Sequence, residues 1–365
     1  MNKALLKTIR NRMPWAIASR AFRANGIPTS QGWDRTIGRL KSLKDDKLET
    51  IIESLLFEHA LFGEKFTKFY SVTDKQKNKI REFIEGVDIP NNVFSAAFPK
   101  EVNKAAFENV TEPQVPVAKF SNGDGMCLVY TSEMKLTYRE KLSAGDFGEA
   151  VSDILRGYDE IIGLKFRSVQ LFNVIWISHF DNLLEVRVDN PQGMPSEASH
   201  QLHSLLKGMI NNALGKNKLE FARDLFPLID SIYNSEDGKV VELGFSTSTG
   251  SVKLEKMRRT KTCLREELYH VGGKRELKTR ISPYKISVQW SFGGDDEAYR
   301  PELTLAGTSR GLNSIAAKQS APQVTGASIA NCIGAVDYEH VRERISAHLT
   351  KVSPASSEIS QTAAE

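Results

Sequence analysis

Residues 169–190, VQLFNVIWISHFDNLLEVRVDN, contain two apolar runs separated by a short polar segment. The first run places seven large apolar side chains between Val169 and Ile177, and the second alternates apolar with charged residues from Leu184 to Asp189. Alternation with a period of two is typical of a β-strand, and two such runs around a polar connection predict an antiparallel hairpin. We therefore expect this hairpin to be the centre of a sheet on which the rest of the domain is built.

The length and composition of the chain favour more than one domain. The chain has 365 residues, of which 40% are hydrophobic, enough to bury a substantial core. The longest apolar run is far shorter than the roughly 18 to 20 residues that cross a bilayer, so we expect no membrane partner. Three separated cysteines without a CxxC spacing are typical of a reducing compartment, which favours the cytoplasm, or the nucleus in a eukaryote.

Positive charge is concentrated at the N-terminus. Residues 1–44 contain ten basic side chains and the single acid Asp34, a formal charge of +9 in a chain whose net charge is +4. Clustered ammonium and guanidinium groups attract polyanions and release their counterions on binding. The asymmetry therefore favours a polyanionic partner such as nucleic acid.

Three short helices are predicted within the basic segment. The first lies within residues 4–12 and is interrupted by Pro14, and the second runs from Trp15 to the helix-ending pair Asn25-Gly26. Thr29 or Ser30 is expected to cap a third helix, which leaves Arg35 and Arg39 four residues apart on one exposed face. A helix, a glycine-containing turn and a second helix form the outline of a helix-turn-helix, in which the second helix enters the major groove.

The same basic segment has two other interpretations. Short basic helix pairs also form solvated bundles that bind nothing, and an Arg-rich, acid-poor N-terminus resembles an organelle targeting peptide. The apolar pattern from Trp15 to Leu43 argues against a removable peptide, because such a peptide needs no packing surface of its own.

The domain organisation follows from changes in composition along the chain. Residues 1–107 are predicted to form a helical basic module, which includes a long amphipathic helix extending from Leu48 to Phe66. Residues 108–116 contain two prolines and form the expected linker. Residues 117–350 form the expected mixed α and β domain, and residues 351–365 are too polar to pack and are expected to be disordered.

Two elements are predicted before the central hairpin. Residues 127–138 alternate as a strand, and residues 146–158 have helical spacing. In that helix we expect Phe147, Val151, Ile154 and Leu155 to face inward.

A second basic block lies within residues 252–285, where eleven basic side chains outnumber four acidic ones. Tyr269 and Tyr284 are interleaved with these cations as candidate stacking groups, and Gly272-Gly273 would allow close approach to a backbone. A single polyanion could bridge both blocks if the fold brings them to one side. The alternative is two solvated surfaces on different sides of the molecule.

Two patterns that could carry chemistry are weak. Glu197, His200 and His203 on a predicted helix, with Asp189 nearby, lack the i, i+4 histidine pair of a zinc-protease helix, so no metal site is predicted. A nuclease would need an acid followed by an acid-x-lysine triplet on a core strand. Asp237, Glu242 and Glu276-Leu277-Lys278 imitate that pattern, but the triplet lies in a segment too polar to be central.

The sequence thus predicts an α+β protein, with a helix-turn-helix-like N-terminal module followed by a mixed domain built on an antiparallel hairpin. The function that we expect is non-catalytic binding of nucleic acid, DNA in preference to RNA, without a cofactor. The alternatives are a scaffold subunit that docks other proteins, and a metal-dependent nuclease. The candidate contacts to nucleic acid are Arg20, Arg23, Arg35, Arg39, Lys41, Lys44, Lys256, Arg258, Arg259, Lys261, Lys274 and Arg275.

Overall fold

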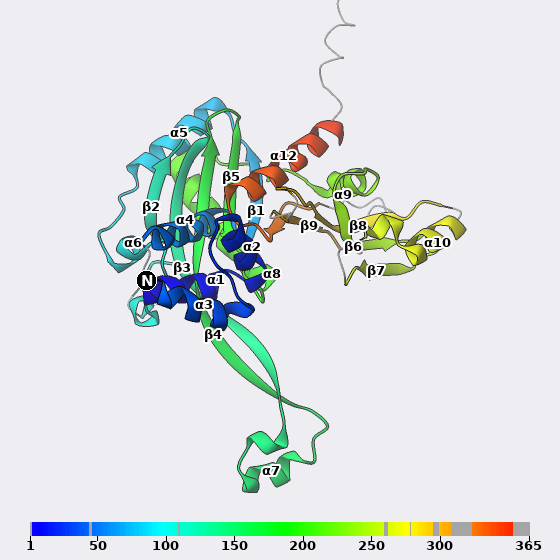
Figure 1. Ribbon diagram of the computed structural model, residues 1–365. Helices are drawn as coiled ribbons and strands as arrows, with labels where there is room; N and C mark the ends of the chain where they lie inside the picture. The colour runs from blue at the N-terminus through cyan, green and yellow to red at the C-terminus, as the bar shows by residue number, and fades with distance from the viewer. Residues whose placement is uncertain are drawn as a thin grey trace, which may run out of the picture.

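The computed structural model describes residues 2–43, 46–108, 110–258, 262–277, 279–294, 299–308 and 323–352. Within them ten strands form one antiparallel sheet in the order β2-β3-β4-β5-β1-β10-β9-β8-β6-β7 (Figure 1). The strands are β1 (Lys65–Ser71), β2 (Val115–Ser121), β3 (Gly125–Leu142), β4 (Ile161–Ser178), β5 (Leu183–Asp189), β6 (Lys239–Ser246), β7 (Val252–Lys256), β8 (Ser282–Gln289), β9 (Glu302–Ala306) and β10 (Ala327–Ala330). This architecture confirms the α+β fold class.

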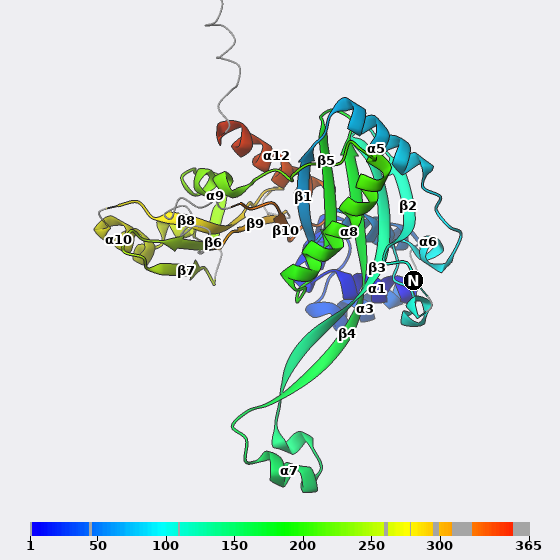
Figure 2. The same ribbon diagram turned by 180° about the vertical axis from the view of Figure 1, so that it is seen from behind.

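Helices cover both faces of the first half of the sheet. The helices of the described ranges are α1 (Lys3–Arg12), α2 (Trp15–Ala24), α3 (Gly32–Ser42), α4 (Asp46–Phe62), α5 (Asp74–Gly86), α6 (Val93–Ala97), α7 (Glu149–Leu155), α8 (Ser196–Leu214), α9 (Phe226–Tyr233), α10 (Leu268–Glu276) and α12 (Ala335–Val352). Helices α1 to α4 lie over one face, and α5 and α8 cover the opposite face (Figures 1 and 2). None of the helices in the described ranges is long and apolar enough to cross a bilayer.

The predicted central hairpin is present. Strands β4 and β5 pair antiparallel, with Val174 opposite Arg187 and Ile177 opposite Leu184. Both faces of β5 are buried, so its charged residues are as inaccessible as its apolar ones. The alternation that predicted the strand therefore does not separate a core face from a solvent face.

Strand β1 lies inside the segment predicted to be a helical module. It pairs with β5 on one side and with β10 on the other, so residues 1–107 contribute a central strand to the sheet. The predicted helix continued to Phe66 because Phe62 and Phe66 have helical i, i+4 spacing. The helix in fact ends at Phe62, and a Cβ on the next residue, Gly63, would lie 2.6 Å from the carbonyl oxygen of His59. Strand β2 likewise begins at Val115, within the predicted linker.

The outer halves of β3 and β4 leave the sheet as a long two-stranded arm with α7 at its tip (Figures 1 and 2). Strand β3 keeps its β2 partner only as far as Thr131, and β4 pairs with β5 only from Val174 onward. The expectation that the tip helix packs inward was wrong for Val151 and Ile154, which are 47% and 71% exposed.

The three cysteines, Cys127, Cys263 and Cys332, are buried and unpaired as thiols. Burial raises the pKa of Cys127 to about 12, so this thiol stays protonated at neutral pH. All three therefore occupy the interior as small side chains.

Candidate nucleic-acid interface

Helices α1, α2 and α3 pack around their own apolar cluster together with α4. Trp33 of α3 meets Trp15 and Phe22 of α2 edge to face, at ring-centroid distances of 5.2 and 5.9 Å. Helix α3 begins at Gly32, slightly later than predicted, and Thr36 within it accepts a hydrogen bond from the backbone of Ser30 at 2.9 Å. Residues 25–31 connect α2 and α3, a longer connection than the three or four residues of a compact helix-turn-helix.

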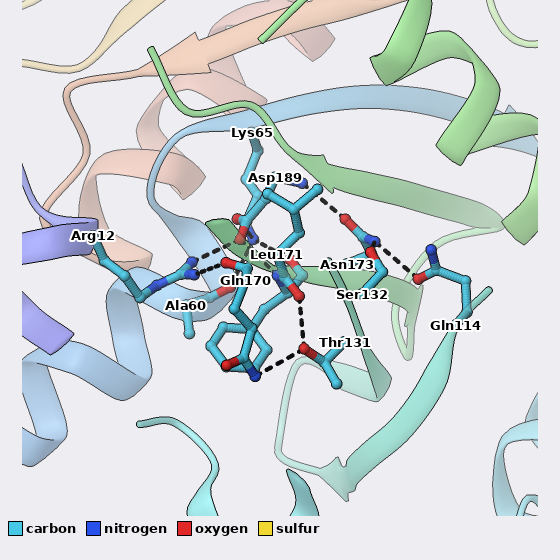
Figure 3. Close-up of polar contacts among 11 residues, drawn as sticks. Arg12, Ala60, Lys65, Gln114, Thr131, Ser132, Gln170, Leu171, Asn173 and Asp189 are labelled. Atoms are coloured by element: carbon cyan, nitrogen blue, oxygen red, sulfur yellow. Dashed lines mark hydrogen bonds and ion pairs between the residues drawn. The ribbon is translucent and has the colours of Figure 1, made fainter. Parts of the chain in front are cut away.

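Arg12, at the end of α1, anchors this module to the sheet (Figure 3). Its guanidinium donates to a carboxylate oxygen of Asp189 at 2.7 Å and to the carbonyl of Gln170 at 2.9 Å. The same group lies 4.6 Å from the ring centroid of Phe172. Removing the charge of Arg12 would therefore leave part of a buried carboxylate uncompensated, which is costly in a low-dielectric interior.

Lys65 of β1 occupies the other side of the same carboxylate. Its ammonium is fully buried and donates to Asp189, to the carbonyl of Ala60 at 2.6 Å and to that of Phe172 at 2.8 Å. Burial lowers the pKa of Lys65 to about 8, against the opposing effect of Asp189. Burial alone would raise the pKa of Asp189, but Arg12 and Lys65 hold it below its usual value, so the triad carries its charges at neutral pH.

Backbone and amide groups complete the surroundings of Asp189. Its carboxylate accepts the N–H of Phe172 at 2.6 Å, and its own N–H donates to the side-chain carbonyl of Asn173 at 3.1 Å. Asn173 in turn donates to Gln114 at 2.9 Å (Figure 3). These bonds fix the register of β5 against β4 at the point where α1 is attached.

Arg20 is a second anchor of the module. Its side chain is only 8% exposed, and its guanidinium donates to the carbonyls of Ala16 and Asn331, each at 3.1 Å. Asn331 follows β10, so Arg20 ties α2 to the sheet. This internal position turns its guanidinium away from solvent. We therefore assign Arg20 no contact with nucleic acid.

The solvent face of α3 carries the cations predicted for it. Arg35 and Arg39 are exposed one helical turn apart, and Gly38 between them leaves the surface open. Arg35 donates to the side chain of Gln31 at 3.2 Å and Arg39 to the carbonyl of Thr29 at 3.4 Å, and both acceptors are uncharged. Within the described ranges neither guanidinium forms an ion pair, so each keeps its charge available.

The single acid of α3 is neutralised from within the module. Asp34 forms an ion pair with Arg10 of α1 at 2.7 Å. The remaining predicted cations near this face, Arg23 at the end of α2 and Lys41 in the last turn of α3, are exposed. Lys44 lies outside the described residues. The exposed side of α2 and α3 is therefore cationic with no free carboxylate of its own.

The second basic block is largely engaged by internal partners. Lys256 of edge strand β7 forms an ion pair with Glu242 at 3.0 Å, and Lys285 binds the same carboxylate. Lys274 of α10 donates to the hydroxyl of Tyr233 at 3.0 Å and lies over its ring. These contacts hold three of the cations in place, and Glu242 offsets one of the two lysine charges beside it.

Arg258, Lys274 and Arg275 are the candidate cations of the second block that remain exposed without a neutralising carboxylate in the described part of the chain, although Lys274 is held by the hydroxyl of Tyr233. Tyr269, one of the predicted stacking groups, is also exposed. Arg259 and Lys261 lie outside the described residues. The second block therefore retains fewer free cations than its composition indicated.

The two blocks belong to different halves of the sheet. The N-terminal module is anchored to β5, whereas the second block lies around edge strand β7 and α10 (Figure 1). Six strand spacings separate β5 from β7, which is about 29 Å at ~4.8 Å per spacing. A ligand that contacts both blocks must therefore span a large part of the molecule.

The residues of the two weak chemical patterns have internal partners. His203 is buried against Tyr70, whose hydroxyl lies 3.2 Å from its Nε2, and burial lowers the pKa of His203 to about 3. Within the described ranges no three His, Cys, Asp or Glu side chains converge as ligands. Of the nuclease pattern, Glu242 is held by two lysines and Lys278 lies outside the described residues.

One hydrogen-bonded chain was not foreseen from the sequence. Ser231 Oγ lies 2.8 Å from His348 Nδ1, and His348 Nε2 lies 3.3 Å from Asp237 Oδ2, the three residue types of a hydrolase triad but with the two imidazole nitrogens exchanged. Ser231 lies inside α9, where backbone N–H groups already serve the helix and cannot stabilise an oxyanion. A neighbouring cavity of about 790 Å³ is lined by residues that include Trp290 and Arg344, but neither Ser231 nor His348 is among the described lining residues. We therefore assign these three hydrogen-bonded residues a structural role: they hold α9, α12 and the turn after α9 together.

No family model, curated protein or solved structure matches this chain. The assignment of a function therefore depends on the placement of the residues described above.

Proposed function

We propose that this protein binds duplex DNA, without converting it chemically, through the exposed side of α2 and α3. The residues to which we assign phosphate contacts are Arg23, Arg35, Arg39 and Lys41. Arg258 and Arg275, in the other half of the sheet, are a secondary set for longer DNA. The two guanidinium groups on α3 can also reach guanine edges in the major groove, for which their fork geometry is suited.

One observation supports this proposal above the others. Arg35 and Arg39 keep their charges free on one helical face, while Asp34, the only acid in that part of the chain, is bound by Arg10. Several other cations of the module are used internally, as Arg12 and Arg20 illustrate. A solvated bundle that binds nothing has no need for this division between buried anchors and an exposed face whose single acid is already paired.

The proposal is tested by measuring the affinity of the full chain for a fluorescent DNA duplex at two salt concentrations. Four phosphate contacts predict a loss of affinity of about 100-fold between ~50 and ~200 mM salt. The double variant Arg35→Glu, Arg39→Glu should bind at least ten-fold more weakly at the lower salt concentration. Its slope of log affinity against log salt should be smaller by about two.

A matched control is the double variant Lys75→Glu, Lys79→Glu. It makes the same change of charge, also four residues apart on a helix, but on α5, which covers the opposite face of the sheet. This control should bind like the wild type. Equal loss of binding in both double variants would show that only net charge matters, and binding to duplex RNA but not to DNA would refute the choice of partner.

A further inference from the structure

The arm formed by residues 135–167 exposes a row of large apolar side chains. Ile162, Leu164 and Phe166 of β4 are 48%, 58% and 70% exposed, and they alternate along the strand so that all three share one face. Their cross-strand partners on that face are Lys141, Arg139 and Thr137. Three aligned apolar side chains that project from the body are unusual for a surface without a partner.

The two strands of the arm also have open edges. Beyond Thr131 on β3 and before Val174 on β4, each strand pairs with no described strand except the other. A two-stranded ribbon is marginally stable by itself in water, and its unpaired N–H and C=O groups are a template for another strand. Both the apolar row and the open edges therefore favour a protein surface as the occupant.

Charge is divided along the arm in a self-complementary way. The tip, residues 143–160, contains five acidic side chains and one basic side chain. The shaft, residues 135–142 and 161–167, contains five basic side chains and one acidic side chain. Some of these charges pair internally, as in Lys141–Glu160, but Arg139 of the shaft and Asp159 of the tip have no ion-pair partner in the described part of the chain.

We infer that the arm binds the arm of a second copy of this chain. The two arms lie side by side in opposite directions, which places the acidic tip of each against the basic shaft of the other. In this arrangement the row of Ile162, Leu164 and Phe166 of each arm lies along the tip of the other, where Ile154 and Tyr158 are 71% and 64% exposed. Nucleic acid is a poorer occupant, because the acidic tip repels phosphates.

The first test is sedimentation equilibrium of the full chain between about 1 and 100 µM, where interfaces of modest affinity dissociate. The wild type should form dimers within this range, and Phe166→Asp should raise the dissociation constant at least ten-fold. Phe221→Asp is the matched control, because Phe221 is 91% exposed but lies outside the arm. A wild type that stays monomeric up to the highest concentration would overturn the inference, as would equal weakening by both variants.

A charge exchange tests the opposed direction of the arms. Arg139→Glu and Asp159→Lys should each weaken dimerisation, because each places like charges between one tip and the neighbouring shaft. The double variant should recover most of the wild-type affinity, since both copies then carry the exchanged pair. Recovery is expected only when the partner is a second copy, and a double variant weaker than either single variant would overturn the tip-to-shaft arrangement.

The DNA measurements distinguish this inference from the proposed function. The Phe166→Asp variant should still bind a short duplex that can contact the α3 face of one copy. If it remains fully dimeric but loses DNA binding, the arm contacts nucleic acid instead and the inference fails.

Discussion

Strand β5 and the outer half of β4 differ in which kind of side chain they bury. Strand β5 buries Glu185, Arg187 and Asp189 almost completely, whereas the arm portion of β4 exposes Leu164 and Phe166. Both segments alternate in the sequence, so alternation identifies a strand without saying which side meets water. The two strands differ in their surroundings. Helices and aromatic rings enclose β5, whereas in the described part of the chain β3 alone accompanies the arm portion of β4.

The buried charges of β5 are tolerated because each has a specific neighbour. Glu185 accepts from Arg187 at 2.9 Å and from the hydroxyl of Tyr338 at 2.9 Å. The guanidinium of Arg187 lies 4.3 to 5.1 Å from the ring centroids of Tyr338, Phe62 and Trp176. Burial would lower the pKa of Arg187, but Glu185 raises it overall, so the guanidinium stays charged.

Among the substitutions that test this contrast, Asp189→Ala is expected to have the largest effect on the free energy of unfolding. The substitution leaves Arg12 and Lys65 buried without their shared carboxylate, which should lower the free energy of unfolding by about 3 to 5 kcal/mol. Urea denaturation followed by circular dichroism measures the change. Asp153→Ala, on the exposed arm tip, is the control and should change stability by less than about 0.5 kcal/mol.

Arg187→Met should be the next most damaging change. It leaves the buried carboxylate of Glu185 with only the more distant guanidinium of Arg342, at 3.9 Å, as a described cationic neighbour, so we expect a loss of about 3 kcal/mol in the free energy of unfolding. The double variant Glu185→Leu, Arg187→Met removes both charges and should be more stable than Arg187→Met alone. A double variant less stable than the single one would show that the pair is a source of stability and not merely a tolerated pair of charges.

His59 gives the buried region a pH-dependent stability. The side chain is enclosed with both ring nitrogens unpartnered in the described structure, and burial, assisted by Arg12, lowers the pKa of His59 to about 3. Below pH 6.5 the unfolded chain gains a proton that the folded chain does not, so stability falls with falling pH. At pH 5 the expected loss is about 2 kcal/mol. His59→Leu should have a flatter profile of unfolding free energy between pH 6.5 and 5, and an unchanged profile would contradict the assignment.

The smallest effect is expected from Phe166→Asp on the stability of the monomer. Because the side chain is exposed on the arm, the free energy of unfolding at low protein concentration should change by less than about 0.5 kcal/mol. A loss of several kcal/mol would mean that the arm folds back onto the body in solution. This measurement uses a concentration at which the wild type is monomeric, so it is independent of dimerisation.

Local pattern was sufficient to predict the hairpin, the three N-terminal helices and the exposed position of Arg35 and Arg39. It was insufficient for β1, because Phe62 and Phe66 match helical spacing and the effect of Gly63 depends on the close approach of His59. It was also insufficient for the arm. Val151 and Ile154 have the spacing of a packed helix, and no local signal shows that no surface lies beneath them.

The candidate interface was predicted only in part for a related reason. Composition counts every cation equally, whereas the fold uses Arg12 and Arg20 as anchors and leaves Arg35 and Arg39 free. Whether a cation becomes a buried anchor or stays exposed depends on acceptors remote in sequence, such as Asp189 and Asn331. A signal was nevertheless present, since three charged residues within an apolar strand imply buried partners whenever both faces of that strand are covered.

The position of β1 limits how this chain can be divided. It lies between β5 and β10, and Glu64 next to it accepts a hydrogen bond from Asn331, 267 residues later. During synthesis β1 therefore has no second neighbour until Ala327–Ala330 has been made, a long-range dependence that slows folding. A fragment that stops before β10 leaves a central strand with one bare edge, so shortened versions of this protein should aggregate instead of folding as separate units.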